Sequence, residues 1–480
     1  MGVMAPKQLR SVRARRAAVV AACVALVCAG TVAASAASTR AHAAHSAHAT
    51  ADSSWTVYHG NALSTGVSTA LSSVSLARRA WTSPALSGQV YGEPLVFGAD
   101  VYVATENDVV YALSAKTGRV VWSRHLASAV PNSKLPCGDI GPVVGITGTP
   151  VIDPSRSEIF VVADELVGGG PEHYLVGLST TNGRVELRVH VDPPGSTPDA
   201  LLQRTGLNLD HGNVVFAMGG NYGDCAAYQG RVVSVGETGS PRRIFTVDAR
   251  AGDSQGAIWM GGAAPVVDAR GNVWVTTGNG SVSSSGQPYD DSDGILELSS
   301  TLRLKQYFAP TNWTTNNGED LDMTVAPILL SDGQAILAGK SRIAYLLQAS
   351  HLGGIGNGET NLGGLCDQDI DGGAAFEGST VYLPCLSGPV ALQVGTSPPS
   401  LHMVWSSGIG GGPPLLVADR VWTIGQNGVV YGLNPASGQV VQQANVGQMA
   451  NHFPTPSVGD GLFLVPTATG VVAFHGTAAG

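Results

Sequence analysis

The stretch PLVFGADVYVATENDVVYALSAKTGRVVW, residues 94–122, decides the fold. It contains four short apolar runs, each ended by a turn signal such as Gly98-Ala99-Asp100 or Thr117-Gly118. β-Branched and aromatic residues dominate the runs, and the turn signals come too often for a helix to form. The pattern therefore predicts four antiparallel strands joined by tight turns.

The same unit returns along the chain. A large apolar residue within a β-rich run marks the second strand of eight units, at Tyr102, Phe160, Phe216, Trp274, Ile336, Tyr382, Trp422 and Phe463. A four-stranded sheet must bury both faces against neighbours, and repeat periods of roughly 40 to 60 residues are typical of propellers. We therefore predict an all-β protein, an eight-bladed β-propeller of four-stranded antiparallel blades.

The two ends of this propeller are expected to close the ring together. The last unit, after Pro456, supplies strands only near residues 462–465 and 471–474, so it lacks an outer strand. Residues 76–81 end in Trp81, as the fourth strand of the opening unit ends in Trp122. We predict that this N-terminal strand completes the last blade, because pairing there removes an exposed edge.

A short motif in the opening unit resembles a known family. Ala112 to Gly118 followed by Trp122 resembles the tryptophan-docking motif A-x-D-x-x-T-G-x-x-x-W of pyrroloquinoline-quinone (PQQ)-like propeller repeats, with Ala112, Thr117, Gly118 and Trp122 at motif positions. Ser114 stands where the family usually has Asp. Residues 177–187 and 432–442 resemble degenerate copies that keep Gly183 and Gly438 but not the tryptophan.

The resemblance covers residues 55–480 and is to the quinoprotein alcohol dehydrogenase-like superfamily, as a secreted bacterial member. It implies the propeller fold but leaves the activity open, because non-enzymatic assembly factors share these repeats with the quinone dehydrogenases.

The N-terminus has the pattern of an export signal. Five basic residues precede an uncharged, alanine-rich stretch at residues 17–37, and small residues at 34–36 and 41–43 offer cleavage sites. We assign residues 1–43 to a signal peptide, residues 44–54 to a disordered Ala/His-rich linker and residues 55–480 to the propeller. An uncleaved membrane anchor or a lipid-modified Cys23 are the alternatives. The predicted location is outside the cell or in the cell envelope.

Export would leave four cysteines in the mature chain: Cys137, Cys225, Cys366 and Cys385. An even number outside the cytoplasm predicts two disulfides, with three possible pairings. We favour Cys366–Cys385, close in sequence within one blade, which leaves Cys137–Cys225. The quinone-dependent alcohol dehydrogenases typically carry a vicinal Cys-Cys disulfide beneath the cofactor, and this sequence has no such pair.

The net charge argues against several kinds of partner. Six of the 26 Lys and Arg residues lie before position 44, and no acidic residue precedes Asp52, so 20 basic and 35 acidic residues leave a mature charge near −15. Such a chain is a poor partner for nucleic acid or an anionic membrane. We expect a monomer that meets a membrane only through an uncleaved N-terminal segment.

Ligands of propellers bind where the inner strands converge on the axis, so polar residues just before those strands are the first candidates. They are Glu93, Thr147, Asp210, Trp259, Asp320, Asp322 and Asp371. In the quinone dehydrogenases a tryptophan forms the floor under the cofactor and an Asp or Glu acts as base. Trp259 and the pair Asp320 and Asp322 are the nearest types here. The alternative is that these carboxylates cap turns.

The loop Asp367-Gln368-Asp369-Ile370-Asp371-Gly372 has the start of a calcium-loop pattern. Asp367, Asp369 and Asp371 are its candidate ligands. The final ligand of either template is missing, because Gly378 and Ala375 stand at the twelfth and ninth positions.

Two interpretations of function follow. No Ser-His-Asp set, phosphate loop or H-E-x-x-H motif occurs, and His211, His351 and His452 are isolated. The first interpretation is an exported, non-catalytic propeller that binds a protein, glycan or small molecule on its funnel face. The alternative is a PQQ- and calcium-dependent dehydrogenase oxidising an alcohol or sugar. The missing vicinal cysteines and the eroded docking motifs favour the first.

Overall fold

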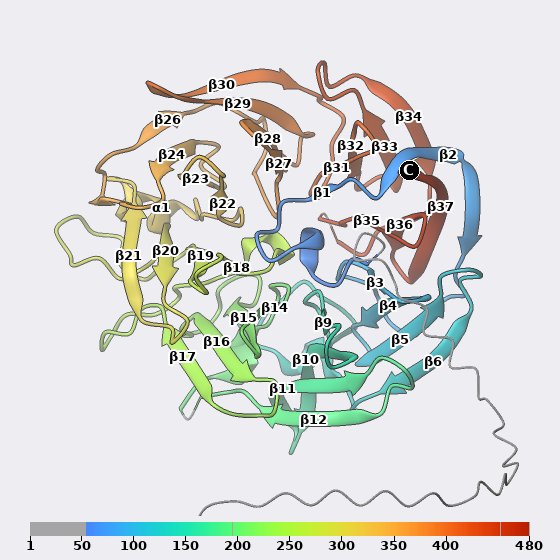
Figure 1. The fold of residues 1–480 in the computed structure, drawn as a ribbon. Helices are drawn as coiled ribbons and strands as arrows, with labels where there is room; N and C mark the ends of the chain where they lie inside the picture. Colours follow the sequence, from blue (N-terminus) through green and yellow to red (C-terminus); the bar gives the residue numbers. More distant parts are fainter. Residues whose placement is uncertain (1–53, 194, 452, 480) are drawn as a thin grey trace, which may run out of the picture. The chain divides into compact units, whose positions relative to one another are not determined.

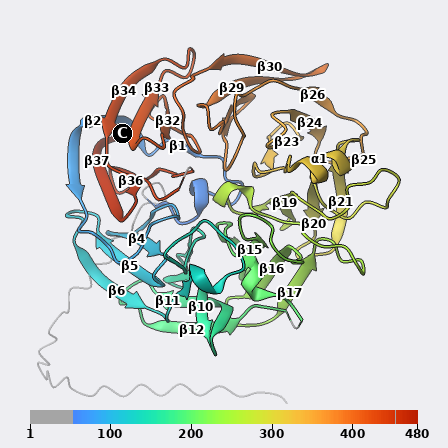
Figure 2. The same cartoon turned by 180° about the vertical axis from the view of Figure 1, so that it is seen from behind.

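The structure, a computed structural model, describes residues 54–479 except Pro194 and His452. The predicted signal peptide or anchor (1–43) and all but the last residue of the predicted linker (44–54) lie outside the described residues. The described part forms eight small antiparallel sheets arranged in a ring (Figure 1, and from behind in Figure 2). The predicted eight-bladed propeller is confirmed.

The first four blades follow the chain from residue 95 to residue 309. Blade 1 contains β3 (Leu95–Phe97), β4 (Asp100–Thr105), β5 (Val109–Ser114) and β6 (Val120–His125). Blade 2 contains β9 (Val151–Asp153), β10 (Glu158–Val167), β11 (Gly170–Ser179) and β12 (Val185–His190). Blade 3 contains β14 (Asn208–Asp210), β15 (Asn213–Gly220), β16 (Arg231–Gly236) and β17 (Arg242–Thr246), with β13 (Leu201–Leu202) also paired to β15. Blade 4 contains β18 (Val266–Val267), β19 (Val273–Thr277), β20 (Gly294–Leu298) and β21 (Leu304–Ala309).

The other four blades complete the circle. Blade 5 contains β22 (Ile328–Leu329), β23 (Gln334–Ala338), β24 (Ala344–Gln348) and β26 (Thr360–Leu362). Blade 6 contains β27 (Ala375–Glu377), β28 (Thr380–Leu383), β29 (Val390–Thr396) and β30 (Pro399–Ser406). Blade 7 contains β31 (Leu415–Val417), β32 (Arg420–Ile424), β33 (Val429–Leu433) and β34 (Val440–Asn445). Blade 8 contains β35 (Ser457–Gly459), β36 (Leu462–Thr467), β37 (Gly470–Ala478) and β2 (Leu71–Thr82).

A few elements lie outside this plan. The short strands β7 (Val130–Pro131) and β8 (Val143–Val144) pair with each other between blades 1 and 2. The strand β1 (Val67–Ser68) runs parallel to β31, and β25 (Gly354–Ile355) runs parallel to β21. The helix α1 (Trp313–Glu319) lies in the connection from blade 4 to blade 5.

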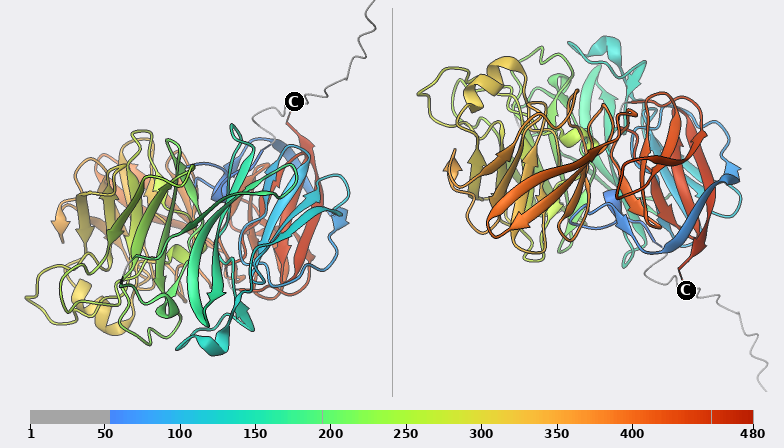
Figure 3. Two further views of the ribbon diagram at one scale, coloured as in Figure 1. Left: turned by 90° about the horizontal axis from the view of Figure 1, so that it is seen from below. Right: turned by 90° about the horizontal axis from the view of Figure 1, so that it is seen from above.

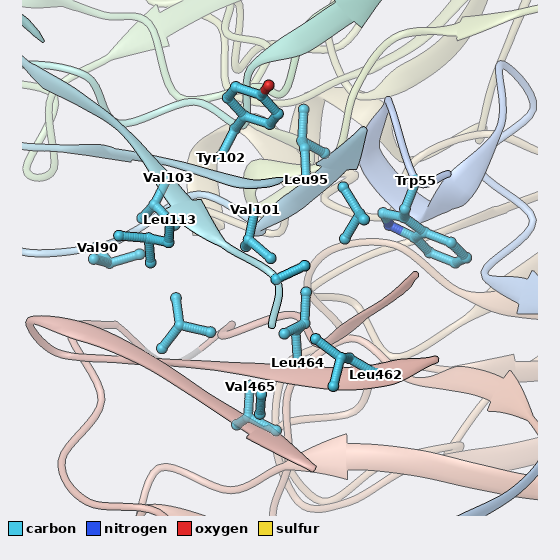
Figure 4. Close-up of a cluster of buried hydrophobic side chains, with 14 of the residues drawn as sticks. Trp55, Val90, Leu95, Val101, Tyr102, Val103, Leu113, Leu462, Leu464 and Val465 are labelled. Carbon is cyan, nitrogen blue, oxygen red and sulfur yellow. The ribbon is translucent and has the colours of Figure 1, made fainter. Parts of the chain in front are cut away.

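Burial explains why the strands read as apolar runs. A middle strand of a blade is covered on both faces by neighbouring sheets, so all five residues of β19 are buried, whereas the outer strand β6 is mostly exposed. The side views in Figure 3 show the blades standing side by side with their faces together. Figure 4 shows Leu95 and Val101 of blade 1 packed near Leu462 and Leu464 of blade 8, within one buried cluster.

The ring closes as the sequence predicts. Strand β2 pairs antiparallel with β37, in a register that joins Leu71 to Ala478 and Thr82 to Val472. The strand therefore serves as the outer strand of blade 8, and the first and last strands of the propeller lie side by side (Figure 1).

Tryptophans on outer strands join neighbouring blades. Trp81 of blade 8 lies over Gly118 of blade 1, and its Nε1 donates a hydrogen bond of 2.7 Å to the carbonyl of Ala115. Trp122 lies over Gly183 of blade 2 in the same way. Trp405 of blade 6 and Gly438 of blade 7 form a third pair. The degenerate motif copies keep the glycine but not the tryptophan. Each of these glycines is still covered by an indole ring, because the outer strand of the preceding blade supplies the tryptophan.

The sequence predicts that the segment before β1 belongs to the propeller but does not predict its position there. Residues 55–66, called here the axial segment, cross the centre of the ring (Figure 1). Their backbone carbonyls accept hydrogen bonds of 2.8 to 2.9 Å from the inner strands of five blades, at Val96, Ile152, Val267, Phe376 and Leu416. The axial segment thus closes the central channel. Its carbonyls accept hydrogen bonds from N–H groups of the inner strands that would otherwise be unpaired.

A glycine substitution tests the docking of Trp81. Gly118→Ala puts a methyl group into the Trp81 ring at a residue with φ of 67°. We expect a loss of about 3 kcal/mol in the free energy of unfolding, from strain plus overpacking. Gly98→Ala is the matched control, because its φ is 64° and nothing lies within 4 Å of the added carbon. It should cost about 1 kcal/mol from backbone strain alone. Equal losses in urea unfolding would show that the docked ring does not constrain this turn.

Candidate functional site

A cavity of about 500 Å³ lies at one end of the ring axis. It is lined only by segments that lead from one blade to the next and by turns between second and third strands, which share one end of a propeller. We call it the funnel cavity, and its lining residues are Asp139, Arg204, Tyr222, Gly223, Asp224, Trp259, Gly261, Asp320, Thr324, Lys340, Asp369, Asp371, Leu386 and Phe453.

Lys340 is the centre of one wall of the funnel cavity. Its Nζ lies 2.8 Å from Asp320 Oδ1 and 2.5 Å from Asp322 Oδ2, and 5.8 Å from the centre of the Trp259 ring. The ammonium group is thus held by two carboxylates on the face of an aromatic ring, an arrangement that stabilises a cation. Trp259 is itself fixed, because its Nε1 donates a hydrogen bond of 2.8 Å to the carbonyl of Gly220.

Burial sets the electrostatics of this wall. Asp322 is fully buried, and burial raises the pKa of its carboxyl group although the charge of Lys340 opposes the rise. Burial alone would lower the pKa of Lys340, but the charges of Asp322 and Asp320 outweigh it and raise that pKa. The Lys340 ammonium is therefore charged at neutral pH and keeps Asp322 from being an isolated buried charge.

Arg204 lies at the base of the funnel cavity. Its guanidinium group lies 4.1 Å from the centre of the Phe453 ring, and burial lowers its pKa against the opposing charges of Asp139 and Asp371. Arg204 and Phe453 also line a second, adjoining cavity of about 10 Å³, which has room for about one water molecule.

Glu93 borders this smaller cavity. It is buried and accepts hydrogen bonds from Trp55 Nε1 and from the backbone N–H of His59, both in the axial segment. Burial raises the pKa of Glu93 well above its usual range. Thr147 lies on the same small cavity, with its hydroxyl 3.2 Å from Glu106. Glu93 therefore holds the axial segment, and both Glu93 and Thr147 line the smaller cavity and not the funnel cavity.

Only some of the site residues predicted from the sequence lie at the funnel cavity. The structure brings Trp259, Asp320, Asp322, Asp369 and Asp371 together at the funnel cavity, Asp322 through its contact with Lys340. Lys340 and Arg204 were missed. Lys340 lies in the β23–β24 turn of blade 5, where its N–H also donates to the carbonyl of Asp322, and Arg204 approaches its acidic neighbours from the connection between blades 2 and 3. The rarity of lysine after the signal region was the one sequence signal that could have pointed to Lys340.

The expectation for Asp210 is wrong. It does not precede an inner strand but ends β14, in the turn to β15, where its Oδ1 lies 2.6 Å from His211 Nδ1. It borders a different hollow, together with residues of the axial segment such as Asn61 and Leu63. The short inner strand of blade 3 therefore ends at Asp210, the residue after which the sequence pattern expected it to begin.

The proposed calcium loop gains no support from the geometry. Among the described residues, no group of three or more His, Cys, Asp or Glu side chains is positioned to hold a metal ion. Asp367 is exposed and Asp371 is buried, so these carboxylates face different surroundings. The loop is shaped instead by pairing, since Ile370 forms a β-bridge with Cys385 and Leu386 N–H donates to the carbonyl of Asp369.

The residues of the funnel do not fit PQQ with calcium. Asp322 Oδ1 accepts a hydrogen bond from the backbone N–H of Asn279, and Oδ2 is bound by Lys340, so both oxygens of this carboxylate already have a partner. Five carboxylates and two cations line the cavity, and both cations already have acidic neighbours. A tricarboxylate cofactor would meet net repulsion there.

Both favoured disulfides are present. Cys137 is bonded to Cys225 and Cys366 to Cys385, with Cα atoms 6.0 and 5.9 Å apart. In the described part of the chain, no helix is long and apolar enough to span a bilayer.

The comparisons with known proteins agree with this fold. Residues 28–283 match the family described as outer membrane protein assembly factor BamB, which is more than half of the chain. The chain therefore belongs to this family of PQQ-like β-propellers. No curated protein matches the sequence.

Solved structures of two kinds are similar. The quinohemoprotein alcohol dehydrogenase from Comamonas testosteroni is 16% identical with a TM-score of 0.63, over 90% of this chain and 82% of that one. A europium-containing methanol dehydrogenase is 13% identical with a TM-score of 0.61, over 88% and 90%. BamB from Moraxella catarrhalis is 14% identical with a TM-score of 0.52, over 82% and 96%. At these identities the likeness shows the fold alone, and it extends to enzymes and to an assembly factor.

Removal of Lys340 tests the charge arrangement of the wall. Lys340→Met leaves Asp322 buried without its partner, so we expect a loss of about 3 kcal/mol in unfolding free energy at pH 8. The pKa of Asp322 is raised in the folded state, so the loss should shrink as pH falls toward 5 and the carboxyl group takes up a proton. Adding Asp322→Asn should restore most of the stability.

Arg184→Met is the control for this experiment. Arg184 pairs with Glu186 at 2.8 Å, but the two side chains are 71% and 36% exposed, so neither is left as a buried charge and the removal should cost at most about 1 kcal/mol. A Lys340→Met loss that is no larger than this, or that does not depend on pH, would contradict the assignment.

Proposed function

We propose that this protein is an exported, non-catalytic propeller that binds a ligand in the funnel cavity, outside the cell or in the cell envelope. The observation that carries the proposal is the cavity itself, whose volume of about 500 Å³ suits a small ligand or a protruding side chain of a partner. On the wall around Trp259, Asp320 and Asp322 are held by Lys340, and Asp322 also accepts a hydrogen bond from the backbone N–H of Asn279.

The lining favours a neutral or cationic ligand. Tyr222, Trp259 and Phe453 provide aromatic surface, and the carboxylates outnumber the cations. Aromatic faces with carboxylates suit a glycan or a basic group of a partner protein, whereas an anion would be repelled. The funnel face is also where the sequence leads us to expect binding of a protein, glycan or small molecule.

Three observations support export. The two disulfides are typical of proteins outside the cytoplasm. The family is described as outer membrane protein assembly factor BamB, and that description is compatible with an envelope location. The basic and alanine-rich N-terminal pattern is the third.

A PQQ-dependent dehydrogenase remains the second candidate, favoured by one observation. Trp259 and Asp322 lie on the same wall, as a cofactor floor and a base would, and the fold resembles that of a quinohemoprotein alcohol dehydrogenase. The engaged oxygens of Asp322 and the lack of vicinal cysteines weigh against it.

A ligand screen tests the proposal. Neutral oligosaccharides, basic peptides and polyanionic compounds are titrated against the full chain by calorimetry, and we expect binding only among the first two groups. Tyr222→Ala, at a funnel residue that is 69% exposed, should weaken the binding about tenfold. Val121→Ala, at a residue that is 54% exposed on an outer strand, should leave it unchanged. Binding that is insensitive to Tyr222→Ala would place the ligand elsewhere.

The enzymatic alternative has its own assay. The protein is incubated with PQQ and calcium and screened with alcohols and sugars in a dye-linked oxidation assay. We expect no turnover above the cofactor-free control. Turnover that Asp322→Asn abolishes would overturn the non-catalytic assignment.

A further inference from the structure

Both disulfides join segments that line the funnel cavity, but the two disulfides differ in how their segments are supported. Cys137–Cys225 joins the connection between blades 1 and 2 to the β15–β16 loop of blade 3, across 88 residues of sequence. Cys366–Cys385 joins two segments only 19 residues apart, at blade 6. Four of the five carboxylates that line the cavity lie within five residues of one of these cysteines: Asp139, Asp224, Asp369 and Asp371.

The segments around Cys366–Cys385 are held together without the disulfide. Asp371 N–H donates to the carbonyl of Pro384 at 3.1 Å, and Leu386 N–H donates to the carbonyl of Asp369 at 2.9 Å. Ile370 and Cys385 form a β-bridge, and both cysteines are buried. These backbone bonds would keep Asp369 and Asp371 in place after loss of the disulfide.

The segments around Cys137–Cys225 have no such support. Among the described residues, no hydrogen bond joins residues 135–142 to residues 221–230. Each loop is bonded elsewhere, for example through Asn132 to Ile140 and through Gln255 to Asp224. Both loops also carry a carboxylate that lines the cavity, Asp139 and Asp224, and Asp224 faces the like charge of Asp320. The disulfide is therefore what holds these two loops against each other.

Access also separates the two disulfides. Cys225 is exposed and Cys137 is partly exposed, whereas Cys366 and Cys385 are buried. Exposed disulfides react with thiols before buried ones, because the attacking thiolate must reach a sulfur. A reductant should therefore open Cys137–Cys225 first.

We propose that Cys137–Cys225 is a redox-sensitive clamp on the funnel cavity. A dithiol reductant attacks one sulfur through its thiolate and forms a mixed disulfide. Its second thiol then displaces the remaining cysteine, leaving two cysteine thiols and an oxidised, cyclic dithiol. The loops that carry Asp139, Tyr222 and Asp224 then separate, and the funnel widens while the blades stay folded. As a means of regulating ligand binding this rests on the proposed function, but the widening itself can be measured without a ligand.

The test uses the fluorescence of Trp259, which lines the cavity. The oxidised full chain is treated with dithiothreitol, and the new thiols are alkylated and located by mass spectrometry. Quenching by iodide is measured in parallel, with Trp259→Phe as the background to subtract. We expect Cys137 and Cys225 to be labelled first, with an unchanged far-ultraviolet circular dichroism spectrum. Iodide quenching of Trp259 should rise about twofold as the acidic loops move away.

Paired substitutions complete the test. Cys137→Ser with Cys225→Ser should reproduce the increased quenching without reductant, and Cys366→Ser with Cys385→Ser, the matched control, should not. Earlier labelling of Cys366 and Cys385, or unchanged quenching in the first double variant, would overturn the proposal. Unfolding of the blades on selective reduction would also overturn it, because the disulfide would then be a structural support and not a clamp. A failed ligand screen with a positive quenching result would discard the proposed function but not the clamp.

Discussion

The pairing of β2 with β37 is the interaction on which the rest of the structure depends. A four-stranded blade is too thin to be stable alone, so each one relies on the faces of its neighbours. A row of eight such sheets would still expose two end faces and two unpaired edges. The strand from residues 71 to 82 completes blade 8, and Trp81 at its end packs on Gly118 of blade 1. One strand thus joins the first and last blades of the propeller and covers the faces that an open row would expose.

Ring closure also explains the floor of the funnel. The chain must travel from the axis to the rim before β2 can join blade 8, and residues 55–66 take the path across the centre. Their carbonyls pair with inner strands of five blades, and Glu93 holds Trp55 and His59. The channel is therefore closed below the funnel cavity, which leaves a blind hollow lined by acidic and aromatic residues. Lys340 and Arg204 offset part of the acidic charge from within the wall.

Most of the fold was predictable from the sequence because it depends on local patterns. The eight second strands, the closing strand and the two disulfide pairs all follow from short runs, turn signals and cysteine spacing. The axial segment was not predictable in this way, since its backbone pairs with strands that lie 41 to 350 residues further along the chain and its side chains carry no periodic signal. The misplaced Asp210 has a related cause, because a three-residue inner strand has too few residues to fix its ends.

The candidate site was predictable only in part. Trp259, Asp320, Asp322 and Asp371 could be predicted because they lie just before the predicted inner strands. Position along the blade repeat is a local property of the sequence. That position could not show that Lys340 comes from another loop to bind Asp322, or that the calcium-like loop is shaped by pairing with Cys385. The Lys340–Asp322 ion pair and the Ile370–Cys385 bridge each depend on how two separate segments approach each other in space, which the sequence pattern does not give.

Native-state hydrogen exchange of the full chain tests the central claim most directly. If β2 closes the ring, its amides paired with β37 should open only with global unfolding, and so should share the protection of the middle strand β20. Exchange of the β2 amides many-fold faster than those of β20, with the blades intact, would show that the propeller stands without its N-terminal strand and would contradict the account.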